Sequence, residues 1–360
     1  MTKRLRVGLL FGGRSAEHEI SIISARNVAA ALDPQKYEVV PIAIDRTGKW
    51  LSPRASATLL QGASSIKDIP SSESVSLAPD SKGELTSHGG ESGGSVDVVF
   101  PILHGPFGED GTVQGLLKLA NIPFVGCGVL ASALAMDKDA AKRVFRDANI
   151  PVARFVIVRR GDKAAYKKIA AELGEVLFVK PANLGSSVGI AKVRDENEFD
   201  AALLEALRYD NKVLIEEYIK GREIECAVLG NEDPKASVVG EIVVKHDFYS
   251  YEAKYLDENG ASLEIPADIP KESAEEVRAL AVKAFRALEC EGMARVDFFL
   301  TEEGALYINE INTIPGFTNI SMYPKLWEAT GVPYTELIDK LIELAIERHE
   351  RDANLKTGRA

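Results

Sequence analysis

The chain has 360 residues, which is too long for one simple hydrophobic core and typical of two or three domains. Its formal net charge of −11 disfavours a nucleic-acid groove, and its apolar runs are too short to indicate a membrane span. The three cysteines are scattered, without the spacing of a disulfide framework or a metal site, which fits a reducing cytoplasm.

The first third of the chain predicts an open α/β domain. Three apolar runs are expected to be strands, at 6–11, 37–44 and 96–103. A helix is expected at 21–32, and residues 49–96, rich in Ser, Gly, Pro and Asp, predict an irregular excursion with one or two strands. Ligands bind such sheets at the carboxyl ends of the strands, where Gly12-Gly13 and His104-Gly105 follow strands, although Gly-Gly alone is more typical of a plain turn.

The next segment carries lysines at positions suited to phosphates. A helix is predicted at 136–149, and Lys138 in its first turn opposes the helix dipole, so we expect it to answer another charge. A strand at 177–181 ends in Lys180, and a Gly-Ser loop at 183–189 leads into a further strand. This is not a Walker A loop, but its small residues let backbone amides and hydroxyls close over phosphates. A flexible hairpin has the same pattern.

Further strands and helices follow, with a strand edge that ends in acids. The strands are expected at 152–158, 213–215, 224–229 and 237–244, and the helices at 164–173, 198–207 and 271–288. The carboxylates of Glu216 and Glu217 suit hydrogen bonds to a base and a ribose, although a solvated strand end looks the same. The polar, tyrosine-rich residues 245–263 predict a lid, with a surface loop pinned by aromatic residues as the alternative.

A predicted hairpin at 295–316 contains a candidate cation site. Asp297 lies inside its first strand, and Glu310 and Asn312 are two residues apart at the end of the second. Residues i and i+2 of a strand share a face, so pairing brings three oxygen-bearing side chains together. Such ligands suit Mg²⁺ better than Zn²⁺, and a solvated hairpin is the alternative. Helices are expected at 325–330 and 334–351, and the tail from Asp352 predicts disorder.

Five separated blocks of sequence together resemble the D-alanine–D-alanine ligase family. They are GGRSAE at 12–17, HG at 104–105 with GEDG at 108–111, KP at 180–181 with GSSVG at 185–189, YEAKY at 251–255, and RVD at 295–297 with EINTIPG at 310–316. The resemblance covers almost the whole chain and is weakest at 49–96. It implies the ATP-grasp fold, an α/β fold in three domains. An open α/β substrate domain at 1–133 precedes two α+β domains, at 134–222 and 223–360, which bind the nucleotide between them.

The resemblance also implies a reaction and a set of site residues. The family joins two D-alanines for peptidoglycan with ATP, through a D-alanyl phosphate that the amine of the second D-alanine attacks. It uses Mg²⁺, with Mn²⁺ as an alternative, at two ions per site. The implied nucleotide-binding residues are Lys138, Lys180, Ser187, Glu216, Glu217, Tyr218, Ile219, Glu223, Lys254 and Phe299. The implied metal ligands are Asp297, Glu310 and Asn312.

The remaining implied residues bind the two D-alanines and promote the reaction. The catalytic residues are Glu17, Ser186, Tyr255, Arg295, Gly316 and Ser321, and the substrate-binding residues are Glu17, His104, Arg295, Gly316, Ser321 and Met322. Glu17 would pair with the ammonium of the first D-alanine, and Ser321, assisted by Lys254, would bind the carboxylate of the second. Arg295 and the amide of Gly316 would stabilise the anionic tetrahedral intermediate.

Two positions bear on the choice of second substrate. Met322 stands where leucine is expected in many members, a volume-conserving change. Tyr255 ends the lid motif, and in the family a tyrosine there accompanies D-alanine, so we predict a dipeptide product. The alternatives are a D-alanine–D-lactate ligase and another ATP-grasp carboxylate–amine ligase. We expect a cytoplasmic homodimer with no nucleic-acid or membrane partner.

Overall fold

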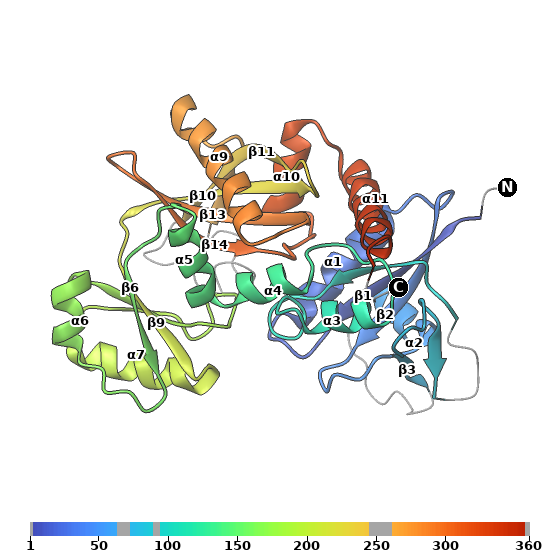
Figure 1. Cartoon of the computed structure of the whole chain (residues 1–360), viewed down its shortest axis with the longest axis horizontal. Coiled ribbons are helices and arrows are strands. Elements are labelled where there is room, and N and C mark those ends of the chain that lie inside the picture. The colour runs from blue at the N-terminus through green and yellow to red at the C-terminus, as the bar shows by residue number, and fades with distance from the viewer. Residues whose placement is uncertain (1–2, 63–72, 89–93, 245–260, 357–360) are drawn as a thin grey trace.

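The protein is described by a computed structural model, which covers residues 3–62, 73–88, 94–244 and 261–356. Figure 1 shows three groups of elements: an N-terminal group at the right, a green central group at the lower left and an orange C-terminal group at the top. Helices α4 (Val129–Met136) and α5 (Lys138–Asp147) connect the first group to the other two.

The N-terminal group is built on a three-stranded parallel sheet. Its strand order is β2-β1-β5, with β1 at Leu5–Gly12, β2 at Tyr37–Ile44 and β5 at Val98–Ile102. The strands are nearly continuous apolar runs, as expected of a parallel sheet that is covered on both faces. Helix α1 (His18–Ala31) packs against β1. The predicted open α/β arrangement is confirmed.

The excursion at 49–96 contains more regular structure than the sequence suggested. Strands β3 (Val75–Leu77) and β4 (Leu85–Ser87) form the expected small antiparallel pair. Helix α2 (Pro53–Leu60) was not predicted, although its start carries two readable signals. Ser52 caps the helix by accepting a hydrogen bond from the amide of Ala55 at 3.3 Å, and Pro53 occupies the first turn.

Helices α3 (Thr112–Leu119) and α4 were also missed. Both have only eight residues, and the sequence of α4, VLASALAM, lacks a polar face whose period could be read. Helix α5 begins as predicted, because the Asp137 side chain accepts a hydrogen bond from the amide of Ala140 at 3.0 Å.

The central group is a four-stranded antiparallel sheet in the order β6-β9-β7-β8. Its strands are β6 (Phe155–Arg159), β7 (Leu177–Pro181), β8 (Ala191–Val193) and β9 (Lys212–Glu217). Helices α6 (Tyr166–Leu173) and α7 (Glu196–Tyr209) contribute Ile169 and Phe199 to its core. The helices cover the face that carries Val179 and Ile215, so Lys180 and Glu216 share the opposite face.

The C-terminal group is a five-stranded antiparallel sheet in the order β12-β11-β10-β13-β14. Its strands are β10 (Gly221–Gly230), β11 (Lys235–Val244), β12 (Ala261–Glu264), β13 (Gly292–Thr301) and β14 (Leu306–Asn312). Helix α9 (Lys271–Ala287) packs against one face of the sheet. Helices α10 (Met322–Thr330) and α11 (Tyr334–Ala353) pack against the other face. Both faces are therefore covered.

Two boundaries in this group differ from the prediction. The proposed lid was drawn to residue 263, but β12 begins at Ala261 and pairs with β11, with Leu263 opposite Ile242. The rest of the predicted lid, at 245–260, lies outside the described residues. Helix α11 includes Asp352 and Ala353, which were assigned to the tail, because the helix continues its hydrogen bonding through them.

One hydrophobic core joins the N-terminal and C-terminal groups. Phe317 packs against Phe100 of β5, with ring centroids 5.9 Å apart, and against Tyr323 of α10, at 5.7 Å. Helix α11 lies beside α1 in Figure 1. The loop that carries Gly316 and Ser321 is thus anchored between the two sheets. Among the described residues, no helix is both long and apolar enough to cross a membrane.

Candidate functional site

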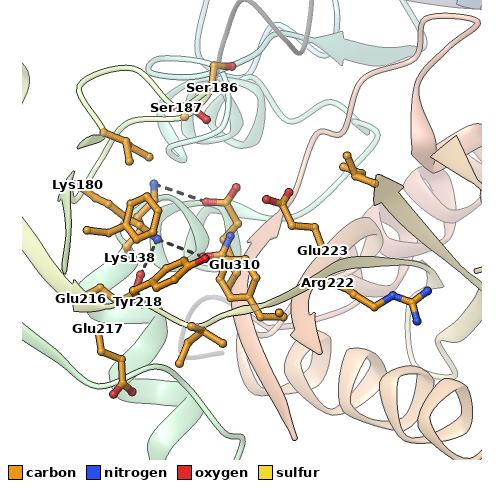
Figure 2. Close-up of a pocket in the computed structure, with 18 of the residues that line it drawn as sticks. Lys138, Lys180, Ser186, Ser187, Glu216, Glu217, Tyr218, Arg222, Glu223 and Glu310 are labelled. Atoms are coloured by element: carbon orange, nitrogen blue, oxygen red, sulfur yellow. Dashed lines mark hydrogen bonds and ion pairs between the residues drawn. The ribbon is translucent and has the colours of Figure 1, made fainter. Parts of the chain in front are cut away.

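A cavity of about 360 Å³ lies between the central sheet and the C-terminal sheet. Strands β7 and β9 supply one wall, and β10, β11, β13 and β14 supply the other. Its lining includes every described residue that was predicted to bind the nucleotide: Lys138, Lys180, Ser187, Glu216, Glu217, Tyr218, Ile219, Glu223 and Phe299. Ser186 and one predicted metal ligand, Glu310, also line it, whereas Asp297 and Asn312 do not. Figure 2 labels several of them, and Lys138, Lys180 and Glu310 come together there from separate elements. Lys254 lies outside the described residues.

Two lysines share one buried carboxylate at the base of this cavity. The Nζ of Lys180 lies 2.5 Å from one carboxylate oxygen of Glu216, and Lys142 pairs with the other oxygen. Burial raises the pKa of Glu216, but the charges of Lys142 and Lys180 outweigh it and lower that pKa to about 2. Burial lowers the pKa of Lys142. Lys180 therefore stands at the cavity wall with a fixed counter-ion behind it.

Lys138 forms an ion pair with a carboxylate on a distant strand, as its position in the first turn of the helix predicted. Its Nζ lies 3.7 Å from a carboxylate oxygen of Glu310 and donates a hydrogen bond to the carbonyl oxygen of Leu184 at 2.6 Å. Figure 2 shows Lys138 and Lys180 pointing into the same space. Two cationic groups and a backbone loop are therefore held around a volume suited to an anion.

The Gly-Ser loop closes one end of the cavity. Ser186 and Ser187 have φ values of 55° and 59°, in the left-handed region that non-glycine residues rarely adopt. Gly185 approaches the N-terminal group, since a Cβ built on it would lie 3.9 Å from a carboxylate oxygen of Glu17. The loop thus touches both the cavity and the residue predicted to bind the first ammonium.

The predicted base-and-ribose edge is only partly aimed at the cavity. Glu217 points away from the two lysines in Figure 2 and pairs with Arg154 at 2.6 Å. Glu216 is paired with the two lysines, so both carboxylates already have cationic partners, although both residues line the cavity. Glu223, Tyr218 and the backbone of Ile219 line the cavity.

The hairpin has the register that the candidate cation site requires. Asp297 lies opposite Glu310, and Asn312 lies opposite Arg295, so all four side chains share one face of the sheet. Arg295 makes a two-pronged contact with Asp297, at 2.8 and 2.7 Å, and lies 2.9 Å from Glu225. Burial lowers the pKa of Arg295, but the charges of Asp297 and Glu225 raise it well above its usual value. The described residues include no group of three His, Cys, Asp or Glu placed to hold a metal ion, so the predicted set rests on two carboxylates and an amide.

A second polar cluster lies where the N-terminal group meets this hairpin. The carboxylate of Glu17 is close to Gly105, where a built Cβ would lie 3.5 Å from its oxygen. Glu109 accepts a hydrogen bond from the amide of Gly105 at 2.5 Å. Burial and the charge of Glu17 raise the pKa of Glu109 well above its usual value. A raised pKa favours the neutral form of Glu109, so Glu17 is the carboxylate of this cluster that is available to an ammonium group.

His104 is held in one tautomer by the same junction. Its Nδ1 lies 3.1 Å from the carbonyl oxygen of Ile314, and a carbonyl only accepts, so Nδ1 carries the proton. Its Nε2 is then an acceptor, buried and without a hydrogen-bond partner among the described residues. Burial lowers the pKa of His104, which keeps the ring neutral.

Gly316 and Ser321 lie together, but Met322 lies apart from them in the core. A Cβ built on Gly316 would lie 2.8 Å from the hydroxyl oxygen of Ser321. That hydroxyl oxygen also lies 2.8 Å from the hydroxyl of Thr318. Met322 is buried against Gly240 of β11 and does not line the cavity between the central and C-terminal sheets. Tyr255, the residue on which the predicted dipeptide product rests, lies outside the described residues.

Sequence reasoning missed four residues of these clusters. Lys142 follows Lys138 by one helical turn, a spacing that could have been read. Glu109 belongs to the GEDG motif and was quoted without a role. Glu225 lies beside Asp297 in the β10–β13 register, and Asn309 lies 3.4 Å from the Nζ of Lys180. Strand pairing identifies Glu225, and the approach of the central sheet to the C-terminal sheet identifies Asn309.

Comparison with known proteins gives full-length matches. Residues 6–127 match the family described as "D-ala D-ala ligase N-terminus", and residues 144–343 match "D-ala D-ala ligase C-terminus". The chain is 54% identical to D-alanine–D-alanine ligase A of Chromobacterium violaceum, with 98% of each chain covered. It is 51% identical to D-alanine–D-alanine ligase A of Escherichia coli K12, with 99% of each covered.

Solved structures agree with this result. The D-alanine–D-alanine ligase of Coxiella burnetii superposes with a TM-score of 0.85 at 41% identity, covering 98% of this chain and 97% of that one. The VanG D-Ala:D-Ser ligase of Enterococcus faecalis gives 0.82 at 37% identity, covering 95% and 100%. The predicted fold and resemblance are confirmed: the chain belongs to the D-alanine–D-alanine ligase family and has its ATP-grasp fold.

Proposed function

We propose that this chain joins two D-alanines to D-alanyl-D-alanine with ATP, for peptidoglycan synthesis. A carboxylate oxygen of the first D-alanine attacks the terminal phosphorus of ATP, so that D-alanyl phosphate forms and ADP leaves. The amine of the second D-alanine, after losing a proton from its ammonium form, attacks the carbonyl carbon. The new C–N bond forms, the bond from carbon to the phosphate oxygen breaks, and phosphate and a second proton leave.

One observation carries this proposal: the Gly-Ser loop links an anion-binding cavity to an ammonium-binding carboxylate. Lys138 and Lys180 line the cavity, and Gly185 at the start of the loop lies against Glu17. A molecule with a carboxylate and an ammonium, such as D-alanine, can then pair with Glu17 while its carboxylate faces the terminal phosphate. Phosphoryl transfer depends mainly on such positioning and on charge neutralisation.

We propose roles for the nucleotide-binding residues on this geometry. Lys138 and Lys180 neutralise phosphates, and Ser186 and Ser187 cover them. The base and ribose contact Tyr218, Ile219, Glu223 and Phe299, with Glu216 and Glu217 contributing through their backbone because their side chains are paired elsewhere. For Lys254, which lies outside the described residues, we propose nucleotide binding on the sequence resemblance alone.

Asp297, Glu310 and Asn312 have the donor chemistry for Mg²⁺ or Mn²⁺, and we propose that they hold two ions. They share one face of the hairpin and offer only oxygen atoms, which hard cations prefer. Arg295 and Lys138 balance the two carboxylates in the structure, so cationic partners suit these positions. When bound, the metal neutralises charge on the phosphates.

The residues around Glu17 would act on the two D-alanines. Arg295 and the amide of Gly316 stabilise the tetrahedral oxyanion, because a buried cation and an amide lower the energy of developing negative charge. Ser321 binds the carboxylate of the second D-alanine, and its contact with Gly316 leaves no room for a side chain there. His104 offers Nε2 as an acceptor. Met322 affects this pocket only through its packing.

A substrate panel tests the proposal. ADP release should require Mg²⁺ and D-alanine and should be absent with L-alanine or D-lactate alone. In competition between D-alanine and D-lactate at pH 6 and pH 8, the dipeptide should dominate, and Tyr255→Phe should raise the share of D-alanyl-D-lactate, most visibly at pH 6, where less free amine is present. Mostly D-alanyl-D-lactate from the wild type at both pH values would overturn the assignment.

Three further features belong to the same proposal. We propose the domain division 1–133, 134–222 and 223–360, supported by the separate sheets of these segments. We propose a homodimer, supported by the exposure of Leu119 at the end of α3 and Leu130 in α4, which sedimentation velocity can test. We propose a cytoplasmic location, where ATP is available.

A further inference from the structure

The base of the cavity holds more positive charge than its own neutrality needs. Glu216 is 2% exposed, Lys142 is 1% exposed and Lys180 is 7% exposed, so one carboxylate is buried with two ammonium groups. Removing charges from water is costly unless they are paired. One lysine is enough to neutralise Glu216, so the pairing of Glu216 does not by itself account for the second lysine.

The two lysines differ in their access to the cavity. Lys180 lines the cavity and also approaches Asn309 and the ring of Phe178, whereas Lys142 does not line it. Lys142 lies on α5, one helical turn after Lys138, and contacts the carboxylate oxygen of Glu216 that Lys180 does not contact. Only Lys180 can therefore contact a bound molecule, and Lys142 can act on that molecule only through Glu216.

This arrangement solves a problem that nucleotide binding creates. An incoming phosphate competes with Glu216 for Lys180, because the ammonium that lies 2.5 Å from the carboxylate must turn toward the ligand. If Lys180 were the sole partner, its departure would leave a buried carboxylate without a counter-ion, and the cost would be subtracted from nucleotide affinity. With Lys142 in place, Glu216 stays paired throughout.

We propose that Lys142 is a positioning residue, the standing counter-ion of Glu216, which frees Lys180 to bind a nucleotide phosphate. The inference rests on the proposed nucleotide site and adds a residue that does not touch the ligand. It predicts that Lys142 matters for nucleotide affinity only while Glu216 is charged.

Four proteins test this coupling: the wild type, K142M, E216Q and the double variant K142M/E216Q. Their affinities for a non-hydrolysable ATP analogue with Mg²⁺, and without D-alanine, are measured by isothermal titration calorimetry. K142M should bind about ten- to hundredfold more weakly, the usual worth of a hydrogen bond to a charged group. The double variant should recover to within about twofold of E216Q, because a neutral glutamine no longer needs Lys142.

K212M is the matched control. Lys212 is also an ion-paired lysine with a largely buried side chain, 2.5 Å from Asp137 and 3.2 Å from Asp139, but it does not line the cavity. Its loss should lower stability without changing nucleotide affinity. Equal weakening in K142M and K212M would therefore overturn the proposal, since a general loss of stability would then explain both.

The remaining outcomes are decisive as well. Unchanged affinity in K142M overturns the proposal, and so does a double variant that binds more weakly than E216Q by the full K142M factor. If K142M does not fold, K142Q replaces it in both the single and the double variant, and the same weakening in the single variant with recovery in the double variant is required. A wild type that binds no nucleotide refutes the proposed function itself, which separates the two failures.

Discussion

Replacing Glu216 by glutamine removes the charge that two buried lysines share. The fall of its pKa from 4.5 to about 2 corresponds to about 3 kcal/mol of stabilisation. Breaking a buried ion pair costs about 3–5 kcal/mol, which agrees with that value. Lys142 can release its proton because burial already lowers its pKa, so the loss stays at the low end. We expect Glu216→Gln to lower the free energy of unfolding at pH 7 by about 3 kcal/mol.

The pH dependence of this contribution has a definite sign. The pKa of Glu216 is lower in the folded chain than in the unfolded chain, so its contribution is complete above pH 4.5 and is lost as the pH falls toward 2. Urea unfolding followed by circular dichroism, at pH 7 and at pH 3.5, measures the free-energy difference between wild type and variant. That difference should be smaller at pH 3.5.

Glu302→Gln is the control for this measurement. Glu302 pairs with Lys220 at 2.9 Å, but both side chains are about three-quarters exposed, and such surface pairs contribute little. The reasoning is refuted if Glu216→Gln costs no more than this control at pH 7, or if the difference grows on acidification.

Three more outcomes are expected. Glu310→Ala should lower kcat more than about a hundredfold with an unchanged melting temperature, because it removes a proposed metal ligand; near-normal turnover would exclude that role. Gly316→Ala should raise the KM of the second D-alanine about tenfold or more, because the added Cβ would lie 2.8 Å from the Ser321 hydroxyl oxygen. An unaffected KM in steady-state kinetics would contradict the placement of Ser321 at the second D-alanine. Glu109→Gln should flatten the pH dependence of stability. The pKa of Glu109 is raised in the folded chain, so its stabilising contribution is present below pH 4.5 and is lost as the pH rises through the folded-state pKa. The variant should therefore melt at a higher temperature than the wild type at pH 8.5. Thermal scans that show no such crossover would refute the burial argument.

The sequence was most informative where function depends on one strand or one loop. Period-two spacing identified Asp297, Glu310 and Asn312 as a shared face, and the β13–β14 register agrees. A strand that ends in Lys180 and a lysine in the first turn of a helix both indicated anion-binding positions, and both line the cavity. In each case the relevant geometry is fixed over a few residues, so local pattern suffices.

Features that depend on distant pairing could not be predicted in the same way. The carboxylates of Glu216 and Glu217 follow each other in β9, but one turns inward to two lysines and the other outward to Arg154. Nothing local marks Lys142 as the partner of Glu216, because the two residues lie on α5 and β9, which several other elements separate in the chain. The role of Glu225 likewise depends on distant pairing, because its partner Arg295 in β13 lies 70 residues further along the chain.

The central claim is that a D-alanine carboxylate is phosphorylated before the second D-alanine attacks, and an isotope experiment tests it most directly. D-alanine labelled with ¹⁸O in its carboxylate is converted with unlabelled ATP and Mg²⁺, and the released phosphate is analysed by mass spectrometry. The account predicts one ¹⁸O in each phosphate, one ADP and one D-alanyl-D-alanine per turnover, because the carboxylate oxygen leaves on phosphorus. Unlabelled phosphate, or label recovered in AMP, would contradict it.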